Sequence, residues 1–97
     1  MTRQVLERSL PSSIDAERSL LGSILVNNEN YYRIVELLRH EDFYLDSHRV
    51  IFRNMTGLME KSRAIDLITL QDELQLSASL ESAGGINYLA GLLDGIP

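Results

Sequence analysis

The chain has 97 residues, of which 44% are hydrophobic, and a formal net charge of -5 from nine basic and fourteen acidic side chains. This length predicts a single domain, which buries roughly 60 to 65% of its unfolded surface by the usual scaling with size. The acids outnumber the bases and no basic cluster occurs in the sequence. Strong direct binding to DNA or RNA is therefore not expected.

Cysteine is absent from the sequence, which excludes disulfides, a thiolate nucleophile and thiolate metal ligands. The first ten residues include Arg3, Glu7 and Arg8, too many charges for the apolar core of a signal peptide. No apolar run approaches the roughly 20 residues that a membrane span needs. We therefore expect a cytoplasmic protein that does not contact a membrane.

Residues 1–10 have weak periodicity and are predicted to be a flexible amino-terminal arm, before a helical domain over residues 11–97. Pro11 marks a helix start, because proline cannot extend a helix backwards and the serines after it can cap the next amides. The first helix is predicted over about residues 14–26. Glu17 falls on its inner face, and a buried carboxylate needs donors, so we expect an ion pair or a hydrogen bond to backbone there.

A second helix is predicted over about residues 30–39, after two asparagines that end the first helix and cap the second, Asn27 and Asn28. Apolar side chains at helical spacing define its expected inner face. They are Tyr31, Ile34, Val35 and Leu38.

The longest run with one period covers residues 41–62 and predicts the central helix of the fold. Its apolar stripe has the width of a core-facing helix face. The stripe consists of Ile51, Phe52, Met55, Leu58 and Met59, with His48 on the same side. Asp46 or Ser47 is expected to cap its first free amides. We expect the other helices to pack around this one.

A fourth helix is predicted after Asp66, which can cap it, with its leucines inward and Glu73 among the residues that face water. Those leucines are Leu67, Leu70 and Leu74. The serine-rich residues 77–82 predict a loop containing at most one turn of helix. Gly84 and Gly85 then break the chain.

The final helix is predicted over about residues 86–93. Its expected inner stripe is Ile86, Leu89, Ala90 and Leu93. No stretch alternates as a strand does over more than a few residues. The sequence therefore predicts an all-α fold, a compact orthogonal bundle of about six short helices.

The sequence contains no recognisable catalytic or cofactor-binding motif. The sequence has no P-loop pattern and no nucleophile elbow, so neither catalytic residues nor a bound cofactor is predicted. His40 and His48 lie near Glu41, Asp42 and Asp46, but the spacing is not HExxH and a metal site is not expected. His48 fits better as a buried histidine with satisfied hydrogen bonds.

Two other classes of function remain open. A stand-alone helical module that binds nucleic acid would need a basic face, whereas the arginines are spread among acids at Arg33, Arg39, Arg49, Arg53 and Arg63. A small helical enzyme would need a polar pocket with perturbed titratable groups, and only Glu17 and His48 qualify. If these two side chains bond to each other in the core, the enzyme alternative loses its support.

Short motifs occur in order over about residues 11–96. They are PSSIDAE at residues 11–17, Leu21-Gly22, EDFY at residues 41–44, His48 with Ile51-Phe52, IDLIT at residues 65–69 with Glu73-Leu74, and Gly84-Gly85 with Tyr88-Leu89. Together they resemble the amino-terminal domain of the bacterial replicative DNA helicase, the DnaB family. The resemblance implies a small all-helical head that belongs to a hexameric, ATP-driven helicase unwinding DNA at the replication fork.

The resemblance also implies partners. In that family the amino-terminal domains form a trimer-of-dimers collar with other helicase subunits and bind the carboxy-terminal domain of the primase. ATP and Mg belong to a separate RecA-like motor domain. Since the sequence ends at Pro97, we expect this chain to lack the motor, its linker and the helical hairpin that follows the head, and to hydrolyse no ATP itself.

Tyr88 is the first candidate for the primase contact. It lies off the predicted inner stripe of the last helix, beside Leu92, where neither side chain is needed for the core. The alternative is that Tyr88 packs on the turn at Gly84 and Gly85 or on the first helix. Asp15, at the start of the first helix, is the second candidate, and its alternative role is interaction with the helix dipole alone.

Overall fold

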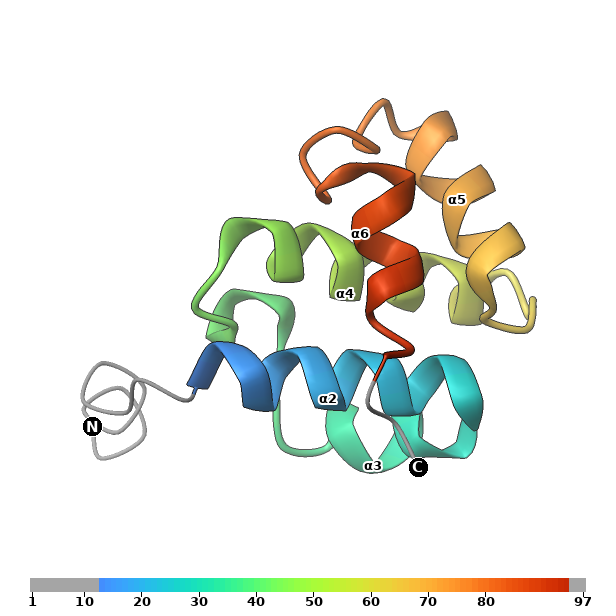
Figure 1. The fold of residues 1–97 in the computed structure, drawn as a ribbon. Coiled ribbons are helices and arrows are strands. Elements are labelled where there is room, and N and C mark those ends of the chain that lie inside the picture. The colour runs from blue at the N-terminus through green and yellow to red at the C-terminus, as the bar shows by residue number, and fades with distance from the viewer. Residues whose placement is uncertain (1–12, 95–97) are drawn as a thin grey trace.

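The computed structural model describes residues 13–94, which form five α-helices and one short 3-10 helix and contain no strand (Figure 1). The elements are α2 (Ser13–Val26), α3 (Glu29–Val35), η1 (His40–Asp42), α4 (Asp46–Glu60), α5 (Leu67–Leu76) and α6 (Gly85–Gly91). The predicted all-α class is confirmed, with five α-helices where about six were expected. The arm predicted at residues 1–10 lies outside the described residues.

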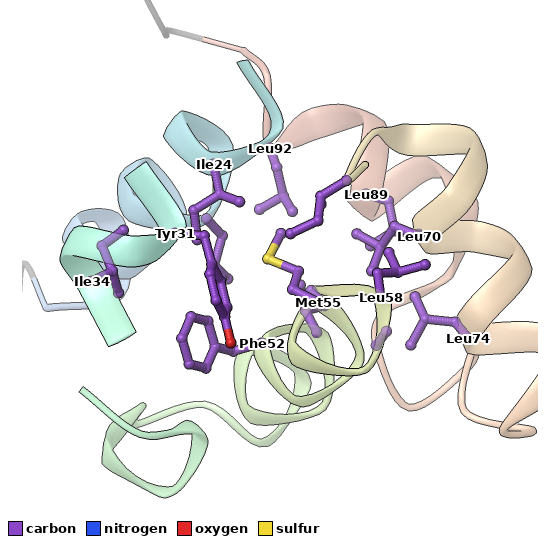
Figure 2. Packing of buried hydrophobic residues seen from close by; sticks show 14 of the residues in the cluster. Ile24, Tyr31, Ile34, Phe52, Met55, Leu58, Leu70, Leu74, Leu89 and Leu92 are labelled. Atoms are coloured by element: carbon purple, nitrogen blue, oxygen red, sulfur yellow. The ribbon is translucent and has the colours of Figure 1, made fainter. Parts of the chain in front are cut away.

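The central helix of the fold is α4, as the sequence predicts. It contacts η1, α2 and α5, and α6 lies in front of it in Figure 1. Met55 and Leu58 are 0% exposed and lie between residues of α2 and α5, as Figure 2 shows for Ile24 and Leu70. Burying an apolar side chain of this size stabilises a fold by about 1.5 to 3 kcal/mol.

Aromatic side chains join α3 and the segment before α4 to the core. The Tyr31 ring of α3 stacks on Phe52, with 5.7 Å between the ring centroids (Figure 2). Phe43 lies 5.2 Å from Phe52 by the same measure. The Tyr31 hydroxyl, at the edge of this group, donates a hydrogen bond of 3.1 Å to Thr56 Oγ1. The predicted inward orientation of Tyr31 is therefore confirmed.

The structure shortens the second helix. Its last residue is Val35 instead of a residue near position 39, and Val35 is 40% exposed although it was predicted to face inward. This prediction is wrong because α3 has only seven residues, whose inner face is taken by Tyr31 and Ile34. The cap residue of α3 is Asn28, whose side chain bonds no amide of the helix, and Asn27 Oδ1 accepts from the Glu29 amide at 3.0 Å.

The amino-terminal caps of α4 and α5 differ from each other. The cap residue of α4 is Leu45 and no side chain caps the helix, so the cap predicted at Asp46 or Ser47 is wrong, because both residues already lie inside the helix. The predicted cap of α5 is confirmed. Asp66 Oδ1 accepts from the Thr69 amide at 2.8 Å, and Thr69 Oγ1 accepts from the Asp66 amide at 2.9 Å.

Glu73 was predicted to face water but is 8% exposed. The ammonium group of Lys61 donates to its two carboxylate oxygens, at 2.8 and 2.9 Å. A Cβ at Gly57 would lie 3.0 Å from Glu73 Oε2, so the glycine on α4 leaves room for the carboxylate. Gly57 lies near the carboxy-terminal end of α4 and Lys61 directly follows that helix. The sequence spacing within α5 therefore could not indicate that these two residues surround Glu73.

The inner face of α6 is rotated relative to the prediction. Leu89 and Leu92 are buried, at 2% and 1% exposure, whereas Ile86 is 51% exposed and Ala90 is exposed. The predicted stripe of Ile86, Leu89, Ala90 and Leu93 is therefore wrong at Ile86 and Ala90. The expectation that Leu92 is not needed for the core is also wrong, because the two turns of α6 direct Leu89 and the following Leu92 inward (Figure 2). Within residues 13–94, none of the helices is both long and apolar enough to cross a membrane.

Candidate partner-docking site

A turn of two glycines leads into α6, and Tyr88 lies in the middle of this helix. Gly84 and Gly85 have φ of 104° and 84°, which side chains other than glycine rarely adopt. A Cβ at Gly84 would lie 2.8 Å from Cγ of the Tyr88 ring. The glycine therefore allows both the backbone conformation and the close approach of the ring, and Tyr88 packs on this turn.

A chain of hydrogen bonds connects Tyr88 to the interior. The Tyr88 hydroxyl lies 2.6 Å from Nε2 of His48, and the two rings stack with an interplanar angle of 28°. On the other side of the imidazole, Nδ1 lies 2.7 Å from Oε1 of Glu17. Because a carboxylate only accepts hydrogen bonds, the bond to Glu17 puts a proton on Nδ1, and Nε2, when it carries no proton, accepts from the Tyr88 hydroxyl.

Glu17, as predicted, is buried and finds its donors. Its Oε1 accepts from His48, and its Oε2 accepts from the Tyr44 backbone amide at 2.5 Å. Glu17 is 7% exposed and His48 is 0% exposed. A catalytic base has to reach the proton it abstracts, and no substrate can touch an imidazole enclosed in this way. The two residues bond to each other, so the enzyme alternative loses its support.

Arg18 of α2 covers the Tyr88 ring from outside. Its Cζ lies 5.7 Å from the ring centroid, within the range of a cation–π contact. Its Nη2 also donates a 3.3 Å hydrogen bond to the Gly91 carbonyl at the end of α6. Arg18 thus joins α2 to α6 at the surface, while His48 joins them in the interior. Tyr88 is held between the two.

The charges around Tyr88 act on its hydroxyl. The pKa of Tyr88 is raised above 10.0, first because burial disfavours the phenolate. The Arg18 guanidinium opposes this rise, and the carboxylates of Glu17 and Asp15 add to it. Asp15 itself is exposed in the first turn of α2. The Asp15 carboxylate thus acts electrostatically on the Tyr88 hydroxyl.

The sequence did not indicate Arg18 as part of this site. Asp15 and Tyr88 were expected on separate grounds; the structure places Tyr88 at the junction of α2 and α6 and Asp15 in the first turn of α2. Tyr88 is half-buried and packs both on the glycine turn and against α2. No local pattern signals the role of Arg18, because its partners lie 70 or more positions away, as in the bond to Gly91 with a separation of 73.

Three arginines of the described residues lie close to acids. Arg39, Arg49 and Arg63 each lie within 4.0 Å of a carboxylate, of Glu41, Asp46 and Asp72 in turn. Among residues 13–94 no group of three or more His, Cys, Asp and Glu side chains is arranged to hold a metal ion. In the same range no buried side-chain nitrogen or oxygen lacks a hydrogen-bond partner. The polar groups of the interior are thus used within the fold.

These features define a small all-α domain with a closed polar interior and a surface built at the junction of two helices. The family model described as "DnaB-like helicase N terminal domain" matches residues 9–97. The replicative DNA helicase DnaB of Buchnera aphidicola subsp. Baizongia pistaciae is 42% identical over 88 residues, which cover 91% of this chain and 19% of that protein. The same helicase of Geobacillus stearothermophilus is 36% identical over 97 residues, covering 100% of this chain and 21% of that protein.

A solved structure agrees with these sequence matches. The crystal structure of the N-terminal domain of DnaB helicase from Mycobacterium tuberculosis has a TM-score of 0.82 and 30% identity, covering 87% of this chain and 58% of that chain. The chain belongs to the family of DnaB-like helicase N-terminal domains. It spans about a fifth of the length of the relatives it matches.

Proposed function

We propose that this chain is the assembly and docking domain of a hexameric replicative DNA helicase, and that it binds the carboxy-terminal domain of the primase. The observation that carries the proposal is the match of residues 9–97 to the helicase amino-terminal domain. In this proposal the domain contributes to a collar of paired helicase subunits in the bacterial cytoplasm. Unwinding with ATP and Mg is the task of a motor domain elsewhere in the helicase.

The chemistry of the described residues supports a docking role over a catalytic one. The one histidine with an acidic partner, His48, is enclosed, and the buried polar groups are satisfied within residues 13–94. A net charge of -5 works against gripping a phosphate backbone. We assign the primase contact to Tyr88, at the junction of α2 and α6, and to Asp15, in the first turn of α2.

A calorimetric titration of the 97-residue chain with the carboxy-terminal domain of a primase from the same genome tests this proposal. We expect saturable binding. A matched titration with single-stranded DNA at low salt is expected to give no signal, and incubation with ATP no phosphate above background. Absence of primase binding by the folded chain would contradict the proposal, and a salt-dependent DNA signal would favour a nucleic-acid-binding module instead.

A further inference from the structure

The buried pair of Glu17 and His48 calls for a role beyond stability. Taking two polar, ionisable groups out of water costs free energy that their mutual attraction does not reliably return, so an apolar pair of similar volume would serve a purely structural purpose as well. Glu17 is 7% exposed and His48 is 0% exposed. Neither can touch a partner protein directly, and the chain of hydrogen bonds that they form ends on Tyr88.

Tyr88 is fixed on three sides. Its hydroxyl is tied to His48 Nε2 at 2.6 Å, its ring lies against the Gly84 turn, and Arg18 covers the ring with Cζ 5.7 Å from the centroid. Only the hydroxyl contact is directional, because a hydrogen bond requires a particular angle of approach whereas packing tolerates small rotations. The position of the imidazole is in turn set by Glu17, which the Tyr44 amide holds.

We propose that Glu17 and His48 are positioning residues for Tyr88, which hold its ring in one orientation beside Arg18 as a preformed contact for the carboxy-terminal domain of the primase. The inference rests on the proposed function and adds a mechanism to it. A contact side chain that is already ordered loses less conformational freedom on binding, which is worth roughly 2- to 10-fold in affinity for one such side chain.

Two variants test the contribution of the hydrogen bond between Tyr88 and His48 separately from that of the Tyr88 ring. Tyr88→Phe keeps the ring and removes the hydroxyl. His48→Gln removes the imidazole that bonds this hydroxyl, at a buried position that the partner cannot reach. Each is expected to weaken primase binding roughly 3- to 10-fold while the chain remains folded. The affinity of the double variant for the primase domain is expected to equal that of the single variant with the lower affinity, because both substitutions remove the same hydrogen bond between Tyr88 and His48.

The outcomes are distinguishable. If the wild-type chain does not bind the primase domain, the proposed function fails and this inference falls with it. If the wild type binds and the folded His48→Gln variant binds equally well, the inference alone is overturned. It is also overturned if the losses of the two single variants add in the double variant, because His48 would then act independently of Tyr88.

A measurement on the unaltered chain keeps the inference testable even if His48→Gln does not fold. Nitrogen-15 NMR of the two histidines is expected to show the proton of His48 on Nδ1. His40 is half-buried and outside this network, so it is the internal control for the assignment of the ring proton. A neutral His48 with its proton on Nε2 would overturn the inference, because Nδ1 could then not donate to Glu17.

Discussion

At the scale of single residues, the side-chain amide of Asn28 joins two connections that are far apart in the sequence. Its Nδ2 donates to the carbonyls of Ile24 and Ile65, both at 2.8 Å, and its Oδ1 accepts from the Ile65 amide at 2.8 Å. Asn28 thus pairs with both backbone groups of Ile65. Because Ile65 is 2% exposed, water cannot replace these bonds.

Asn28→Ala is therefore expected to destabilise the fold by about 2 to 3 kcal/mol, since it leaves the buried amide of Ile65 without an acceptor. The matched control is Asn27→Ala, which removes one exposed capping bond to the Glu29 amide and is expected to cost under about 1 kcal/mol. Urea unfolding followed by circular dichroism measures both. Equal losses for the two neighbours would contradict the bridging role of Asn28.

Tyr88 gives the fold a dependence on alkaline pH. Its pKa in the folded chain is raised above 10.0, so the folded state holds the phenol proton more tightly than the unfolded state. The resulting stabilisation is complete below about pH 10 and is lost as the pH rises through the folded-state pKa. Tyr88→Phe lacks this group, so the stability advantage of the wild type over the variant should shrink above about pH 10.

Thermal unfolding of both proteins across that range measures the difference. Tyr32→Phe, at a tyrosine that is 58% exposed, is the matched control variant. If the difference in unfolding temperature between wild type and Tyr88→Phe is the same at all pH values, burial does not shift the pKa of this hydroxyl.

The sequence predicts that a buried polar side chain requires hydrogen-bond partners, but it does not predict which residues those partners are. The position of Glu17 on an apolar face already implied that its carboxylate needs donors, and His48 was expected to be a satisfied buried histidine. That Tyr88 completes the pair was not predictable, because the bond joins residues separated by 40 positions. It depends on how α6 crosses α2 and α4, which no local pattern specifies.

At the scale of elements, the long helices were predicted well and the short ones poorly. The 14 residues of α2 and the 15 residues of α4 repeat their apolar spacing over several turns, which defines one face. The seven residues of α3 and of α6 make only two turns. In such a helix the packing of neighbouring elements decides which apolar side chains are buried. Ile34 is buried and Val35 is exposed in α3, and Leu89 is buried and Ile86 is exposed in α6.

The ends of α4 and α5 share one backbone motif. Ser62 and Ala78 follow the last residues of these helices with φ of 59° and 55°, a conformation that costs a side-chain-bearing residue about 1 kcal/mol. After Ser62, the Arg63 amide donates to the Leu58 carbonyl at 2.9 Å, and after Ala78, the Ser79 amide donates to the Leu74 carbonyl at 2.7 Å. This is the pattern of a Schellman motif, which favours glycine.

Ala78→Gly is therefore expected to stabilise the fold by about 0.5 to 1 kcal/mol, because glycine adopts positive φ without strain. The same substitution at Ala90, which is exposed within α6, is expected to destabilise by about 1 kcal/mol through the loss of helix propensity. Denaturant midpoints of the two variants should move in opposite directions. A shift of the same sign for both would contradict the account of the α5 terminus.

At the scale of the whole molecule, the all-α class and the central position of α4 followed from the sequence, and the structure of a relative at 30% identity and a TM-score of 0.82 agrees. The apolar residues that the sequence placed inside α4 are buried or packed against the core. The arginines that were spread among acids in the sequence are in part paired with them in the structure. These features determine how the interior of the domain packs. They do not determine which partner its surface binds, so the partner was not predictable from them.

We propose that this helical domain serves partner proteins through the surface around Tyr88. Calorimetric titration with the primase carboxy-terminal domain, run on the wild type, Tyr88→Ala and Tyr32→Ala, tests it most directly. Tyr32 is the matched control, an exposed tyrosine on α3. The account predicts saturable binding by the wild type, a loss of roughly tenfold or more for folded Tyr88→Ala, and unchanged affinity for Tyr32→Ala. No binding by the folded wild type, or equal affinities for all three proteins, would contradict it.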